Sequence, residues 1–97
     1  MKIMAITRRM PGATVDKIQA LQIPEATMVW KFIKENFIRE IYFDAEKPCV
    51  VLVLECASKE EAAMRLASLP MVEQKQIDFD YCTLGPYTQL SNLFAKS

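Results

Sequence analysis

The sequence contains no histidine. Histidine is a common general base and the commonest metal ligand in proteins, and it is a frequent axial ligand of haem. Its absence excludes Ser-His-Asp and Cys-His nucleophilic catalysis. We therefore expect neither a metal ion nor another cofactor. Any acid–base chemistry in this chain has to use carboxylates.

Cysteine is scarce as well, and its pattern is uninformative. The three cysteines, Cys49, Cys56 and Cys82, are odd in number and form no C-x-x-C pair. Such a set predicts neither a disulfide framework nor a zinc site. We expect three free thiols in a reducing compartment, and hence a cytoplasmic protein.

Long apolar runs and an excess of one charge are also missing. The longest apolar run, residues 49–54, is too short to span a bilayer, and Arg8 and Arg9 interrupt the apolar N-terminus, so we expect no membrane anchor and no signal peptide. Twelve basic residues balance twelve acidic ones. A nucleic-acid partner is not expected, because binding phosphates requires a basic stripe.

The pattern of apolar residues predicts a single α+β domain over residues 1–97. Period-two alternation predicts strands, and helical spacing predicts helices behind Pro24 and behind the capping box that starts at Ser58. The strands are expected at residues 2–9, 37–44, 49–57 and 79–84, and the main helices at residues 24–35 and 58–69, with shorter helical segments at 14–22 and from Leu90. The order β-α-β-β-α-β is typical of a ferredoxin-like sandwich, a four-stranded antiparallel sheet with helices on one face.

The predicted third strand is apolar on both faces. Val50, Leu52 and Leu54 alternate with Val51 and Val53, and Glu55 breaks the second set. In the predicted second strand Phe37, Arg39, Ile41 and Phe43 share one face, whereas Ile38 and Tyr42 share the other. An antiparallel sheet with one wet face normally has polar residues there. We therefore expect the sheets of two copies to pair as a homodimer or a higher oligomer; the alternative is that the segment from Leu90 covers its own sheet.

Charged residues at apolar positions mark the candidate site. Glu55 interrupts the apolar third strand, and Glu25 lies on the stripe of the first long helix that carries Met28 and Val29. A carboxylate among apolar groups has a raised pKa and acts as a general acid or base near neutral pH. The hypothesis is a proton-transfer site with Glu25 or Glu55 as base. The substrate-binding candidates are Arg39 as anion clamp with Arg8, Tyr42 and Tyr81 nearby.

Each candidate also has an ordinary structural explanation. Glu25 lies in the first turn of a helix, where a negative charge is favoured. Glu55 has Arg39 or Arg8 as a partner for a simple ion pair. Met28 and Trp30 fit a core or an interface better than a ligand site.

From Glu25 onward the chain resembles the muconolactone isomerase-like branch of the dimeric α+β barrel proteins. Glu25 precedes Asn36 by the spacing at which a family glutamate precedes a helix-ending glycine, and Arg39 matches an arginine just after that helix. Leu69-Pro70-Met71-Val72 is similar to the family's Leu-Pro-Leu-Phe, and Asp78-Phe79-Asp80-Tyr81 with Leu84 is similar to its last strand. The chain departs from the family where Asn36 replaces glycine, where Ile38 and Tyr42 replace tryptophans, and where Gly85-Pro86-Tyr87 replaces a histidine–proline pair.

This resemblance implies a paired α+β barrel that binds a small anionic or aromatic-derived compound and moves a proton without a cofactor. It favours Glu25 and Arg39 as pocket residues. The alternative function is a non-catalytic binding, sensing or assembly module whose apolar sheet face serves only for pairing.

Overall fold

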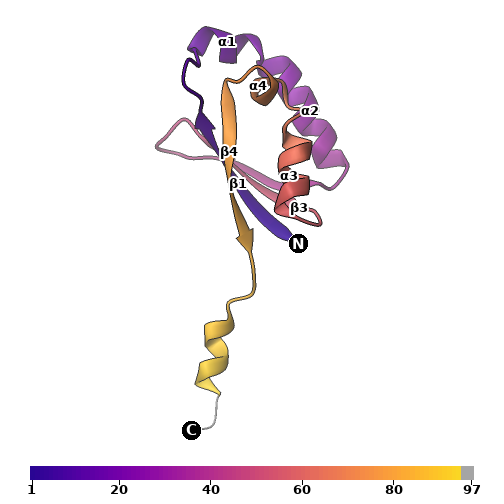
Figure 1. The fold of residues 1–97 in the computed structure, drawn as a ribbon, viewed down its shortest axis with the longest axis vertical. Coiled ribbons are helices and arrows are strands. Elements are labelled where there is room, and N and C mark those ends of the chain that lie inside the picture. Colours follow the sequence, from indigo (N-terminus) through magenta and orange to yellow (C-terminus); the bar gives the residue numbers. More distant parts are fainter. Residues whose placement is uncertain (95–97) are drawn as a thin grey trace.

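The four strands and the helices alternate along the chain much as the apolar pattern predicts (Figure 1). The computed structural model describes residues 1–94. Its elements are β1 (Lys2–Arg9), α1 (Val15–Ala20), α2 (Gln22–Lys34), β2 (Ile38–Phe43), β3 (Val50–Glu55), α3 (Lys59–Leu66), α4 (Pro70–Glu73), β4 (Ile77–Leu84) and the 3₁₀ helix η1 (Thr88–Leu93). All strand pairs are antiparallel, in the order β2-β3-β1-β4. The α+β class and the four-stranded antiparallel sheet are thus confirmed, and the arrangement is consistent with a ferredoxin-like fold.

Local signals in the sequence fix several helix ends. The Glu61 amide donates to Ser58 Oγ at 3.1 Å, as the predicted capping box requires, but Glu61 Oε2 accepts at 2.8 Å from the amide of Ala57, one residue before the N-cap. Asn36 has φ 63°, the left-handed conformation expected after α2. Pro70 does not end α3, which stops at Leu66; it is instead the first residue of the one-turn helix α4, where its missing N–H is harmless.

A β-bulge in β2 corrects the predicted faces of that strand. Ile38 pairs with Leu54, whereas Glu40 already pairs with Val53, so Arg39 is an extra residue on the β2 side. Ile38 therefore shares a face with Ile41 and Phe43, and Tyr42 shares the other face with Glu40. Arg39 consequently does not lie on the face of Ile41 and Phe43, as plain alternation suggested.

One face of the sheet packs against the helices, which lie together on that side in Figure 1. Its buried side chains form a single cluster with α2 and α3: Ile3, Ala5, Phe32, Phe37, Ile38, Leu52, Leu54, Ala62, Leu66, Leu69 and Phe79. We call this side the helix face. Each of the larger members contributes about 1.5–3 kcal/mol by leaving water, so this cluster holds the domain together.

The opposite side, which we call the open face, is covered by none of the helices within residues 1–94. Strand register places these residues on it: Lys2, Met4, Ile6, Arg8, Glu40, Tyr42, Val51, Val53, Glu55, Asp78, Asp80, Cys82 and Leu84. Its centre is apolar, and Met4, Ile6, Val51 and Val53 there are only half-buried. The predicted apolar second face of β3 is therefore present, interrupted by Glu55 at its end.

The C-terminal segment does not cover the open face. Residues 85–94 leave the end of β4 and extend away from the body (Figure 1). Leu93 and Phe94 are 74% and 83% exposed. The alternative that this segment shields its own sheet is wrong for the residues described. None of the helices within residues 1–94 is long and apolar enough to cross a bilayer.

Candidate functional site

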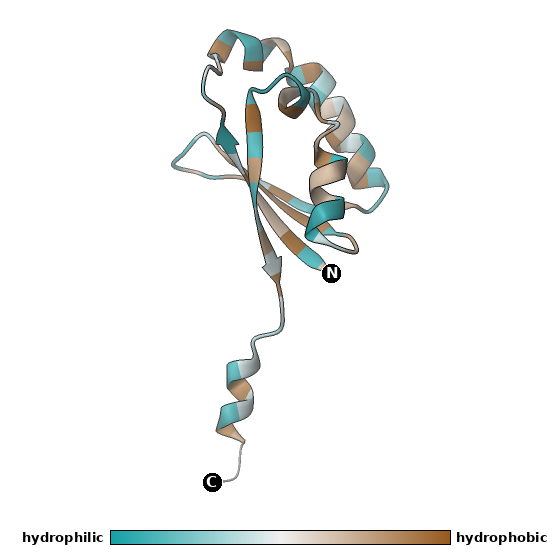
Figure 2. Cartoon of the chain, in the orientation of Figure 1, coloured by the Kyte–Doolittle hydropathy of each residue, from teal (hydrophilic) through white to brown (hydrophobic). Residues whose placement is uncertain are grey.

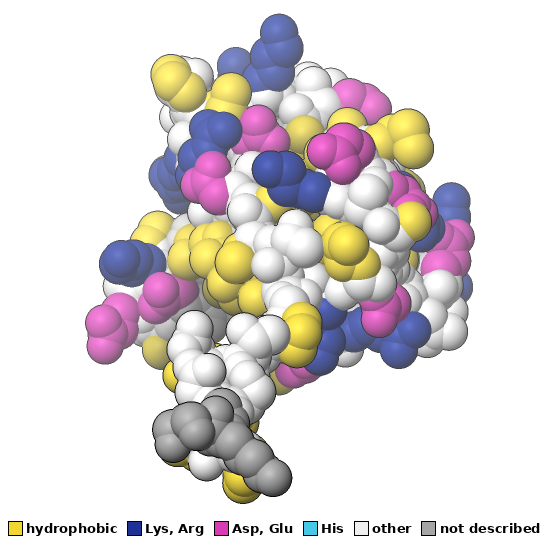
Figure 3. Space-filling model, turned by 60° about the horizontal axis from the view of Figure 1, so that its bottom comes forward, with side chains coloured by type: hydrophobic (Ala, Val, Ile, Leu, Met, Phe, Trp, Pro, Cys, Tyr) yellow, Lys and Arg dark blue, Asp and Glu magenta, His cyan; other side chains and the backbone are white. Residues whose placement is uncertain are grey.

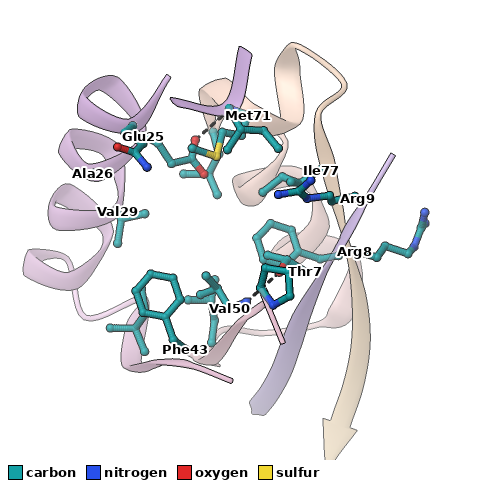
Figure 4. A pocket seen from close by; sticks show the side chains of 17 residues that line it. Thr7, Arg8, Arg9, Glu25, Ala26, Val29, Phe43, Val50, Met71 and Ile77 are labelled. Carbon is teal, nitrogen blue, oxygen red and sulfur yellow. Dashed lines mark hydrogen bonds between the residues drawn. The ribbon is translucent and has the colours of Figure 1, made fainter. Parts of the chain in front are cut away.

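A cavity of about 460 Å³ lies between the helix face and the helices, at the end of the sheet where β1 finishes and β4 begins. Residues of α2 and the one-turn helix α4 border it on the helix side. The walls are mostly apolar, and ligand pockets of proteins commonly fall between about 300 and 1,000 Å³. The lining residues used below are Thr7, Arg9, Glu25, Val29, Val50 and Met71, and Figure 4 shows them around the cavity.

Glu25 supplies a carboxylate to this apolar wall. The Met71 amide donates to Glu25 Oε1 at 2.9 Å, which connects α2 to the first turn of α4 (Figure 4). That amide is one of the helix-end donors that no helical carbonyl satisfies. Within residues 1–94 Oε2 of Glu25 has no hydrogen-bond partner, and it is not sealed from solvent. One carboxylate oxygen thus has a structural role, and the other remains available.

The surroundings of Glu25 favour its protonated form. Burial raises the pKa of Glu25 above its usual 4.5, and the hydrogen bond from Met71 opposes this shift less strongly. No ion pair to Glu25 is present among residues 1–94. A half-buried carboxyl without a cationic partner is suited to exchange a proton with a neighbouring molecule.

Arg9 supplies a guanidinium at the edge of the same cavity. It is the last residue of β1 and pairs with Ile77, so it follows Ile3, Ala5 and Thr7 on the helix face. Arg9 is exposed, forms no ion pair within residues 1–94, and lies next to Ile77 in Figure 4. A guanidinium with free N–H groups binds a carboxylate through two parallel hydrogen bonds.

The neighbouring Arg8 is held on the other side of the sheet. Its Nε donates to Asp80 Oδ1 at 3.0 Å, and its Nη2 lies 3.6 Å from Asp78 Oδ2. Part of Arg8 borders the cavity, but its side chain points away from it in Figure 4. Because two aspartates already neutralise it, Arg8 is poorly suited to bind an anionic ligand.

Arg39 and Glu55 lie outside the cavity. Arg39 Nε donates to the Asn36 carbonyl at 2.8 Å, so the bulged residue closes the turn after α2. Glu55 lies at the end of the open face and forms an ion pair with the N-terminal ammonium group. That contact holds the pKa of Glu55 below its usual value, the opposite of the shift expected from its apolar neighbours in sequence.

The two tyrosines also lie apart from Glu25. Tyr42 is on the open face and donates its hydroxyl to Glu40 Oε1 at 2.7 Å. Tyr81 is on the helix face beside Phe79, with ring centroids 6.3 Å apart, but it is not a lining residue of the cavity. Burial, and to a lesser extent Asp78, raises the pKa of Tyr81 to about 12, so it stays protonated at neutral pH.

Of the six residues singled out from the sequence, the structure thus brings Glu25 and part of Arg8 to the cavity. Sequence reasoning missed Arg9, Thr7 and Met71. Arg9 had a usable signal, because continuing the alternation Ile3, Ala5, Thr7 by one step places it on the helix face. Met71 contributes through its backbone amide, which the sequence does not reveal. Within residues 1–94 no cluster of three side chains suited to hold a metal ion is present.

No protein-family model matches this sequence, and no curated protein matches it. The function therefore has to be argued from the cavity itself.

The raised pKa of Glu25 predicts how stability depends on pH. The folded chain binds this proton more tightly than the unfolded chain, so the contribution of Glu25 is most favourable below pH 4.5 and is lost as pH rises through the folded-state pKa. Glu25→Gln keeps an acceptor for the Met71 amide but removes the charge. We expect its free energy of unfolding, relative to the native chain, to rise between about pH 4 and about pH 8 in urea titrations.

The matched control is Glu73→Gln, which removes an exposed carboxylate from α4. Its stability difference should vary much less over the same range. An equal pH dependence in both variants would show that burial of Glu25 has no special effect.

Proposed function

We propose that the chain binds a small apolar carboxylate in the cavity between α2 and the sheet, and that Glu25 transfers a proton to or from it. The observation that carries the proposal is the pairing, in one apolar cavity, of a half-buried carboxyl with a guanidinium that has no ion pair within residues 1–94. The apolar lining would bind the body of the ligand. Arg9 would bind its carboxylate in place of Arg39, which lies elsewhere.

The proton-transfer step needs no oxidant and no cofactor. In its ionised form Glu25 takes a proton from a carbon next to a carbonyl group of the ligand, and the electron pair of that C–H bond moves toward the carbonyl oxygen. The resulting carboxylic acid then returns the proton to a different carbon, so that a double bond moves and the composition stays the same. A raised pKa makes Glu25 a stronger base than an ordinary glutamate.

The resemblance to muconolactone isomerases supports this reaction type. It favours Glu25, which the helical pattern singles out independently, and it implies a small anionic or aromatic-derived compound as the kind of substrate. The competing function is a binding or sensing module that holds the same ligand without turnover. The hydrogen bond from the Met71 amide to Glu25 is compatible with this alternative, because it gives Glu25 a structural role that does not require catalysis.

We also propose that the chain works as a homodimer in which two open faces pack together. The apolar centre of the open face supports this assembly, as does the pairing of several of its charges within one chain: Arg8 with Asp78 and Asp80, and Glu55 with the N-terminal ammonium group. These groups then do not present unpaired charges to an identical face. Such a self-complementary contact is the usual geometry of a twofold dimer.

Binding is tested with naphthalene-2-carboxylate, a rigid apolar carboxylate, by following backbone amide shifts of the labelled protein. We expect shifts at Thr7, Val50 and Met71, and a dissociation constant about 10-fold to 100-fold weaker for Arg9→Gln, because a charge-assisted hydrogen bond contributes about 1.5–3 kcal/mol. Arg39→Gln is the matched control and should bind normally. Shifts confined to open-face residues such as Met4 and Val51 would contradict the proposed site.

Proton transfer is tested by incubating muconolactone with the protein in D₂O and following deuterium uptake and double-bond movement by NMR. We expect the native chain to accelerate both, and Glu25→Gln to lose about 100-fold or more of this rate while still binding naphthalene-2-carboxylate. Glu55→Gln, which changes a carboxylate outside the cavity, should keep the full rate. Binding without any acceleration by the native chain would favour the non-catalytic alternative.

Pairing is tested by sedimentation equilibrium. Val53 lies at the centre of the open face, opposite Met4 and Glu40 in the sheet. We expect Val53→Lys to weaken dimerisation by about 100-fold or more, because two ammonium groups would be desolvated at the centre of the interface and the Glu40 carboxylate opposite each offsets only part of that cost. Ala63→Lys, on the exposed side of α3, is the control and should dimerise normally. A native chain that is monomeric at micromolar concentration would contradict the proposed dimer.

A further inference from the structure

The segment that follows β4, which we call the arm, carries large apolar side chains that are exposed instead of being packed against the body of the described chain. Its large side chains are all exposed, by 71% for Tyr87, 58% for Leu90, 74% for Leu93 and 83% for Phe94. The chain measures 60 × 29 × 22 Å along its principal axes, and the arm accounts for the elongation visible in Figure 1. We define the arm as residues 85–94.

The arm is too short to form a stable helix in water without tertiary contacts. Its 3₁₀ helix η1 spans six residues, Thr88–Leu93, with local side-chain bonds such as Ser91 Oγ to the Thr88 carbonyl at 2.7 Å. Isolated helices shorter than about 12–15 residues are marginal in water, and 3₁₀ runs beyond three or four residues are uncommon. A helical arm with four exposed apolar side chains therefore requires a surface to pack on. Figure 2 shows the hydrophobic positions interspersed with hydrophilic ones along it.

The flat outline of the open face is smaller than the accessible area that stable dimers bury. Three strand spacings of about 4.8 Å and six residues of about 3.3 Å each give a projected area of roughly 300 Å². Stable interfaces bury about 800 Å² per partner. Side-chain relief raises the accessible area of the face above this projected value. Buried tyrosine or phenylalanine side chains contribute about 150–250 Å² each, so packing of the arm would enlarge the interface substantially.

The arm also begins at the border of the open face. Leu84, the last residue of the edge strand β4, is on that face, and the arm continues directly from it. Figure 3, which turns the lower end of Figure 1 forward, shows hydrophobic side chains on the body next to the base of the arm. The arm and the open face are therefore continuous, and a molecule that covers one is placed to reach the other.

We infer that the arm of each protomer packs against the other protomer, so that two exchanged arms complete the interface that the open faces begin. This inference rests on the proposed dimer. A second copy is the fitting occupant because the arm has no charged side chain between residues 85 and 94, because it continues directly from the open face at Leu84, and because Arg8 and Glu55 on that face already have ion-pair partners within the chain. The arm therefore does not select a partner of opposite charge.

The first test compares two variants of the full chain by sedimentation equilibrium. The apolar variant carries Leu90→Ser, Leu93→Ser and Phe94→Ser, and the matched control carries Gln89→Ser and Asn92→Ser at polar positions of the same arm. We expect the dimer dissociation constant to rise about 100-fold in the apolar variant and to stay within about threefold in the control. If the native chain dimerises and the apolar variant has the same dissociation constant, the arm exchange is contradicted. The proposed pairing of the open faces would then still stand.

The second test asks which chain the arm touches. p-Benzoylphenylalanine is incorporated in place of Phe94 in the full chain, and the dimer is irradiated at a concentration well above its dissociation constant. We expect covalent dimers whose cross-linked peptides join the arm to the other protomer, as shown with one isotope-labelled and one unlabelled population. Cross-links formed within a single chain would overturn the inference. If the native chain does not dimerise, both the arm exchange and the proposed pairing of the open faces are contradicted.

Discussion

A four-stranded sheet has two faces, and in this chain the helices cover one of them while apolar residues occupy the centres of both. The strand register and the position of the outward-facing apolar residues both follow from this constraint. The helix face buries Ile3, Leu52 and Leu54 almost completely, which fixes the strand register, because a slip by one residue would move every side chain to the wrong side. With that register fixed, Met4, Ile6, Val51 and Val53 have to face outward. The proposed pairing with a second copy would remove these side chains from water.

The cavity arises from the uneven helix layer over the covered face. Near Phe32 and Phe37 the layer is thick: their rings pack edge to face with centroids 5.2 Å apart, and the Arg65 guanidinium lies 4.2 Å from the centroid of Phe37. At the other end the single turn of α4 replaces a full helix, and the hydrogen bond from its Met71 amide to Glu25 links it to α2. The residue proposed to move protons thus also holds the cavity wall. This double use explains why a partly buried carboxyl is tolerated at an energetic cost.

Much of this arrangement could be predicted from the sequence, and the exceptions have physical causes. The strands, the capping box at Ser58, the left-handed Asn36 and the apolar second face of β3 all depend on local pattern, which the sequence carries. The predicted faces of β2 were wrong because nothing in the alternation of Phe37, Arg39, Ile41 and Phe43 indicates a β-bulge. The bulge permits both Phe37 and Ile38 to be buried, at 1% and 2% exposure, and that preference is set by the core rather than by the strand. Arg39 was placed wrongly for the same reason. Glu25 could be placed on the buried side of its helix, but its contact with Met71 depends on tertiary structure.

The paired arginines at the end of β1 show how one strand serves both sides of the sheet. Arg8 and Arg9 are adjacent, so their side chains point to opposite faces. On the open face Asp78 and Asp80 from β4 neutralise Arg8, which keeps that face compatible with an identical copy of itself. On the helix face β4 offers Ile77 beside Arg9, so the second charge has no acidic neighbour on that strand and is available to a ligand. The alternation Ile77, Asp78, Phe79, Asp80 in β4 therefore pairs Arg8 with acidic neighbours and leaves Arg9 without one on that strand, as the proposed binding of a carboxylate requires. The strand period thus sends two adjacent arginines to different faces, where Arg8 borders the proposed dimer contact and Arg9 borders the proposed ligand site.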